Sequence, residues 1–95
     1  MRTEPAPDVK GIAESIIARL GLSHIDPARL VFFRSYGSTS RASARIWALP
    51  KIWQSALNVQ PHYVIEVLSQ RYDRMPDDEK EKVVIHKLLH VPKTF

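Results

Sequence analysis

The chain has 95 residues, enough for one domain, and it contains no cysteine, which excludes a disulfide framework and a thiolate metal site. Apolar residues make up 44% and charged residues 25%, as in an ordinary soluble domain, and the net charge is +4. The sequence shows neither a signal peptide nor an apolar stretch of membrane-spanning length, so we predict a cytoplasmic protein with no membrane partner.

The N-terminal part predicts a leader and one helix. Residues 1–7 include two prolines and are expected to form a flexible leader. Asp8 is a predicted N-cap for a helix over Val9–Leu20, in which apolar residues recur every four positions. Gly21 stands where a helix-ending glycine is expected.

The middle of the chain predicts about three strands. "LVFFRSYG" and "ARIWALP" are rich in aromatic and β-branched residues, and Gly37 and Pro50 end them. "KIWQSALNVQP" fits either a continued strand or a short helix. "HYVIEVLSQRY" alternates in the manner of a strand with one wholly apolar face.

The last segment predicts a helix over Asp77–Val91. Pro76 suits its entry, Asp77 or Asp78 its N-cap, and Pro92 its end. A capping box between Asp78 and Glu81 has the right spacing. The order helix, strands, helix predicts an α+β fold in a single domain over residues 1–95.

Two histidines stand four residues apart on this helix. On a helical wheel His90 lies about 40° from His86, so both imidazoles share one face and can reach one metal ion. The expected core face lies on the other side of the helix and consists of Val84, Ile85, Leu88, Leu89 and Val91. A solvated pair of histidines without a metal is the alternative.

The segment "VVIHKLLHVPKTF" resembles the active-site helix of zincin-like metallopeptidases, in which "HELLH" precedes Ile or Val and then Pro. The resemblance is strongest to small metallopeptidases of phages and archaea and covers Ile25–Phe95. It implies a zincin-like fold, zinc-dependent peptide hydrolysis in active relatives, a peptide or protein substrate received by an edge strand, and His86 and His90 as zinc ligands.

The chain departs from that motif at the catalytic base. Lys87 occupies the position of the glutamate that takes a proton from the attacking water, and a cation there also opposes zinc binding. The family's third ligand follows the second histidine, and the sequence contains only Val91–Phe95 there, so the domain is expected to lack its C-terminal part. We do not expect the missing ligand or the missing base to be replaced by His62, Glu66 or Glu79, which we interpret as structural or surface residues. We therefore predict impaired hydrolysis, whether the chain is a fragment, a Glu-to-Lys variant or a natural degenerate relative.

The alternative function is a small basic module that binds nucleic acid or protein. No acidic residue occurs between Asp26 and Glu66, and four cations of that stretch are the candidate contacts: Arg34, Arg41, Arg45 and Lys51. Trp47 and Trp53 could stack on bases, although packing in the core is the favoured interpretation. The substrate and the oligomeric state are not predicted.

Overall fold

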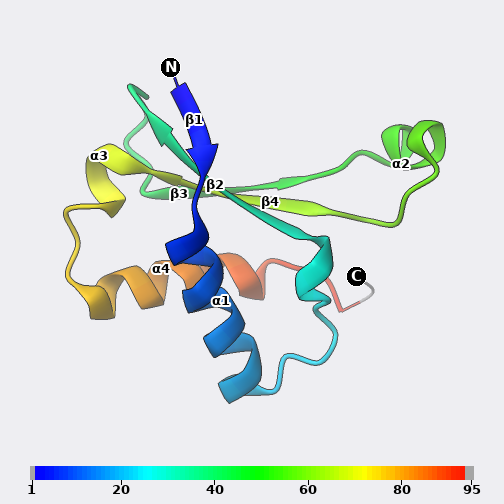
Figure 1. Cartoon of the computed structure of the whole chain (residues 1–95), viewed down its shortest axis with the longest axis horizontal. Helices are drawn as coiled ribbons and strands as arrows, with labels where there is room; N and C mark the ends of the chain where they lie inside the picture. Colours follow the sequence, from blue (N-terminus) through cyan, green and yellow to red (C-terminus); the bar gives the residue numbers. More distant parts are fainter. Residues whose placement is uncertain (1, 94–95) are drawn as a thin grey trace.

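The computed structural model describes residues 2–93, and these form one mixed sheet with its two long helices on one side (Figure 1). The strands are β1 (Arg2–Pro5), β2 (Leu30–Tyr36), β3 (Ala44–Ala48) and β4 (Tyr63–Leu68), and the helices are α1 (Pro7–Leu20), α2 (Lys51–Leu57), α3 (Ser69–Tyr72) and α4 (Asp77–Leu89). A 3₁₀ turn covers Pro27–Arg29. The predicted α+β class is confirmed.

The sheet has the strand order β1-β2-β4-β3. β2 and β4 run parallel in the centre, and the two outer strands are antiparallel to their neighbours. β3 therefore forms one edge of the sheet. α4 packs against β3, so the C-terminal helix lies beneath that edge.

The core fills the space between the sheet and the helices α1 and α4. Alternate residues of β4, Ile65 and Val67, face the helices and are fully buried, because successive strand residues point to opposite faces. α1 contributes Val9 and Ile16, and the remaining buried apolar residues include Ala13, Phe32, Val84, Leu88 and Val91. The burial of these side chains is the main stabilising contribution in a domain of this size.

One segment differs from the sequence prediction, and a second adopts one of its two predicted alternatives. Residues expected to form a flexible leader include β1, whose residues pair with β2 from Arg2 opposite Tyr36 to Pro5 opposite Phe33. The ambiguous segment after Pro50 forms α2, which lies at the far end of the β3–β4 hairpin and has no buried residue (Figure 1).

Trp47 and Trp53 were expected in the core, but each is more than half exposed.

The first helix starts two residues before the predicted Val9, whereas the last helix starts at Asp77 as predicted, and the predicted N-caps are absent from both. α1 begins at Pro7 with Ala6 as N-cap, so Asp8 lies inside the first turn and caps nothing. α4 begins at Asp77 with Pro76 as N-cap, and no side chain caps it, so the predicted Asp78–Glu81 capping box is absent from this helix. Gly21 ends α1 with φ +61°, as predicted.

Arg34 links three parts of the fold. Asp8 does not cap α1 but accepts hydrogen bonds from Arg34. The Arg34 guanidinium donates to both carboxylate oxygens of Asp8, at 3.0 and 2.7 Å, and to Asp73 at 3.0–3.2 Å. Hydrogen bonding from Arg34 lowers the pKa of Asp8. β2 is thereby joined to the start of α1 and to the segment that follows α3.

Tyr72 is a fully buried residue at the end of α3, and its hydroxyl has no hydrogen-bond partner among the described residues. Desolvation raises the pKa of Tyr72 to about 12. Tyr72→Phe is expected to raise the free energy of unfolding by about 1 kcal/mol, because it removes a buried polar group that nothing satisfies. Urea unfolding at neutral pH measures the change.

Tyr36→Phe is the matched control. The Tyr36 hydroxyl donates to Glu4 Oε1 at 2.6 Å, so its removal should lower stability. A loss of stability in both variants would mean that the Tyr72 hydroxyl is satisfied after all, for example by water.

Candidate functional site

α4 presents the two histidines away from the core, as the helical wheel predicts. Val84 and Leu88 are fully buried, whereas His86 and His90 are exposed. Leu89 was expected on the core face but is 64% exposed, because it lies about 100° around the helix from the buried Leu88. The paired histidines therefore lie at the solvent side of the helix, where a ligand could reach them.

His90 follows the last helical residue rather than lying within the predicted Asp77–Val91 helix. It keeps nearly helical angles, with φ −79° and ψ −11°, and its N–H donates to the Lys87 carbonyl at 3.2 Å. The tightened last turn keeps His90 about one turn beyond His86 along the helix axis.

His86 and Lys87 line a cleft between α4 and the start of β3. We call it the His86 cleft; it has a volume of about 390 Å³ and is lined by Ser43, Met75, Glu79, Lys82, Val83, His86 and Lys87. Lys87 therefore lines the same cleft as His86, the first predicted metal ligand. Two of the lining residues, Lys82 and Lys87, are cations, and a single lining residue, Glu79, is an acid.

The described residues supply an incomplete zinc site. Catalytic zinc has three protein ligands, and no group of three histidine, aspartate or glutamate side chains that could hold a metal occurs within residues 2–93. The donor set that fits zinc here is two imidazoles, from His86 and His90. This set is too small for a complete catalytic centre.

Other candidate ligands are engaged elsewhere. His62 precedes β4 in sequence, and its Nδ1 lies 2.6 Å from the Gln60 carbonyl oxygen. Glu66 is buried on the sheet face opposite the core, where Ser35 and Trp47 donate to its carboxylate and Arg45 lies 3.2 Å away. Burial alone would raise the pKa of Glu66, but these hydrogen bonds and the Arg45 charge lower it overall.

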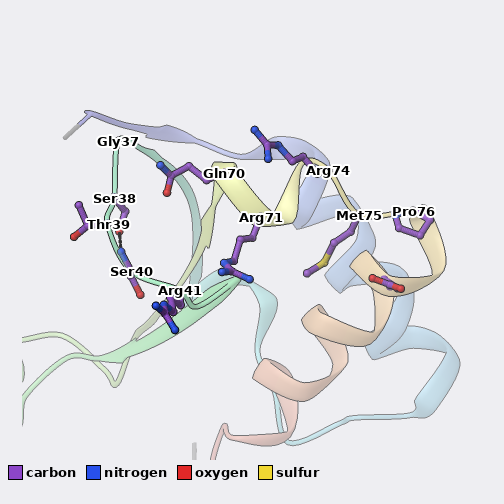
Figure 2. A pocket seen from close by; sticks show the side chains of 11 residues that line it. Gly37, Ser38, Thr39, Ser40, Arg41, Gln70, Arg71, Arg74, Met75 and Pro76 are labelled. Carbon is purple, nitrogen blue, oxygen red and sulfur yellow. Dashed lines mark hydrogen bonds between the residues drawn. The ribbon is translucent and has the colours of Figure 1, made fainter.

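A second cleft adjoins the first and was not predicted. It has a volume of about 860 Å³ and lies between the β2–β3 loop, α3 and the start of α4; its cationic lining residues are Arg41, Arg71 and Arg74 (Figure 2). We call it the arginine cleft. Met75 and Glu79 line both clefts, so the two form one groove along α4. Arg41 lies about thirty residues before Arg71 in sequence, and only the fold brings them together.

The candidate nucleic-acid contacts divide into two kinds. Arg34 is held between Asp8 and Asp73, and Arg45 lies beside Glu66, so their charges are neutralised within the protein. Arg41 and Lys51 are exposed, the first in the arginine cleft and the second on α2. A nucleic-acid surface formed by all four side chains stays a prediction, and the ion pairs leave it with two available cations.

The structure is a small α+β domain in which two histidines lie near the end of a helix that packs against an edge strand. The chain belongs to a family described as "Putative phage metallopeptidase", whose model matches residues 1–95. No curated protein and no solved structure matches the chain. Within the described residues, no helix has the length and apolar character needed to cross a membrane.

Proposed function

We propose that the protein is a peptide-binding metallopeptidase relative with a weak zinc site and impaired hydrolysis. The observation that carries the proposal is the position of Lys87, which opens into the same cleft as His86 in a chain of the metallopeptidase family. The groove would receive the peptide, and the residue that should activate water would be unable to do so.

The metal-binding part of the proposal rests on His86 and His90. When bound, zinc would supply Lewis acidity toward a peptide carbonyl. Lys82 and Lys87 line the same cleft, and their positive charges would repel a dication. Two ligands and two nearby cations together favour weak binding.

The loss of hydrolysis follows from the chemistry of Lys87. A general base in this reaction must accept a proton near neutral pH, as a carboxylate does. An ordinary lysine ammonium already holds its proton at that pH and has no acceptor oxygen. Glu79, seven residues before His86, lies about 10 Å away along the helix axis and is too distant to replace the base.

The peptide-binding part of the proposal rests on β3. β3 pairs with β4 on one side, and no other strand among the described residues pairs with it. An edge strand offers backbone donors and acceptors on which an extended peptide can form hydrogen bonds. Ser43, directly before β3, lines the His86 cleft, so a peptide along this edge would pass the histidine face of α4.

Elemental analysis of the dialysed protein tests the metal site. We expect the wild type to retain less than one zinc per chain and to titrate with zinc at micromolar or weaker affinity, and we expect His86→Ala to abolish that binding. His24→Ala removes a histidine outside the groove and should leave zinc binding unchanged. Equal zinc binding by the wild type and His86→Ala would place any metal elsewhere and reject the proposed site.

A further inference from the structure

The groove along α4 is strongly and unevenly charged. Its two clefts are lined by five cations, which are Arg41, Arg71, Arg74, Lys82 and Lys87, and by the carboxylate of Glu79. Most of this charge lies in the arginine cleft, beyond the end of the His86 cleft. A groove with this excess of positive charge attracts anionic ligands.

The three arginines are available for a ligand. Arg41, Arg71 and Arg74 are exposed, and none of them forms an ion pair or a side-chain hydrogen bond within the described part of the chain. Arg34 and Arg45, by contrast, have carboxylate partners. Figure 2 shows Arg71, from α3, and Arg41, from the loop, both reaching the space between these two segments.

The loop that carries Arg41 is shaped by its own hydrogen bonds. Gly37 turns the chain out of β2 with φ +77°, a conformation that favours glycine. Ser38 is buried, and its Oγ accepts from the Ser40 N–H at 3.1 Å; Ser40 Oγ in turn accepts from the Ala42 N–H at 3.2 Å. These bonds hold the loop opposite α3 and reduce the ordering cost when a ligand binds.

We propose that the arginine cleft binds acidic side chains of a peptide whose backbone continues into the His86 cleft. This inference rests on the proposed function and adds a substrate class, namely acidic peptides. Guanidinium groups bind carboxylates through two parallel hydrogen bonds, and the cleft also offers the Gln70 amide and the hydroxyls of Thr39 and Ser40.

The lining of the cleft favours a peptide over nucleic acid. No aromatic residue lines either cleft, so bases would find no stacking platform there. The exposed tryptophans, Trp47 and Trp53, belong to β3 and α2 and are absent from both clefts. The polar and cationic side chains that line the clefts can bind carboxylates, and this binding needs no aromatic ring.

The spacing predicts where the acidic residues fall. Glu79 marks the junction of the two clefts and lies about 10 Å from His86 along α4, since each helical residue rises about 1.5 Å. An extended peptide covers that distance in about three residues. The acidic side chains should therefore stand about three residues or more from the residue beside His86.

Fluorescence anisotropy with two pairs of labelled peptides tests the inference. One peptide carries a cluster of glutamates at one end, and its partner has glutamine at each of those positions; a second pair places the cluster at the other end. We expect one acidic peptide to bind at least about tenfold more tightly than its glutamine partner, as charge-assisted hydrogen bonds imply, and to weaken with added salt.

Variants of the intact chain identify the cleft. Arg41→Gln and Arg71→Gln should each weaken the acidic peptide about tenfold and leave the glutamine peptide unchanged. Glu79→Gln should strengthen binding of the acidic peptide, because it removes the one carboxylate of the groove. Lys51→Gln, which removes the same charge on α2, should have no effect.

The outcomes separate this inference from the proposed function. If the acidic peptide and its glutamine partner bind equally, and His86→Ala weakens both, the acidic preference is overturned. The proposal that the groove binds peptides would then stand. Failure of every peptide to bind would overturn both. An arginine-dependent affinity for a single-stranded oligonucleotide without any for peptides would overturn the acidic-peptide assignment and support the nucleic-acid alternative.

Discussion

Lys87→Glu is expected to increase both zinc affinity and peptide hydrolysis, and it is the substitution with the largest expected effect on activity. It changes the charge in the His86 cleft by two units, from a cation that repels the metal to an anion that attracts it. We expect zinc affinity to rise about tenfold or more. A general base contributes about 10²–10⁴-fold to such reactions, so hydrolysis of a casein-derived peptide should rise about a hundredfold over the wild type.

Lys87→Gln separates the two contributions. It removes the positive charge without supplying a base, so it should bind zinc more tightly than the wild type and should leave hydrolysis at the wild-type level. Tighter zinc binding by Lys87→Glu without any hydrolysis would show that the missing ligand, rather than the missing base, limits the reaction. No change in zinc affinity in either variant would contradict the assignment of Lys87 to the metal site.

Arg34→Gln is expected to cause the largest loss of stability among the polar substitutions. Arg34 is mostly buried and donates to both Asp8 and Asp73, and it joins β2 to α1 and to the segment before α4. Hydrogen bonds to charged groups contribute about 1.5–3 kcal/mol, so we expect the free energy of unfolding at pH 7 to fall by about 2–3 kcal/mol.

This loss should depend on pH in a defined direction. Hydrogen bonding from Arg34 lowers the pKa of Asp8 in the folded state. A lowered carboxyl pKa stabilises the fold at pH values above the unfolded-state pKa, and that contribution is lost as the pH falls through the folded-state pKa. Urea unfolding at pH 7 and at about pH 3 should therefore show the wild type and Arg34→Gln converging in acid, since an unfolded aspartate titrates near 3.9.

Arg19→Gln is the matched control for Arg34→Gln. Arg19 also pairs with a carboxylate, that of Glu81 at 2.9 Å, and this pair joins α1 to α4. Both of its side chains are substantially exposed, so its removal should cost less than about 1 kcal/mol. Comparable losses in the two variants would show that the Arg34 cluster contributes no more than an ordinary surface ion pair.

The candidate site was predictable where the chemistry lies within one helix. The period of α4 correctly separated buried Val84 and Leu88 from exposed His86 and His90. Leu89 was misplaced because it lies about 100° around the helix from Leu88, at the margin of the apolar face, and periodicity alone does not show whether a neighbouring element covers that margin.

Features that depend on distant pairing were not predictable. β1 has no strong strand pattern and becomes a strand because β2 pairs with it. Arg34 was a candidate for nucleic acid, yet its partners Asp8 and Asp73 lie 26 and 39 residues away in sequence. The arginine cleft has the same origin, since Arg41 comes to line one cleft with Arg71 and Arg74 only through the pairing of β2, β3 and β4.

The order of the strands has a consequence for how the protein folds during synthesis. The parallel pairing of β2 with β4 requires residues 63–68, and the apolar face of α1 is closed by Val84 and Leu88 of α4. Contacts that join distant parts of a chain slow folding, because the closure entropy must be overcome first. The N-terminal helix and β2 therefore leave the ribosome with their apolar faces uncovered, and the core can close only after α4 has emerged. Chaperone binding to ribosome-stalled chains should therefore persist after the release of β4 and end only once α4 has been released.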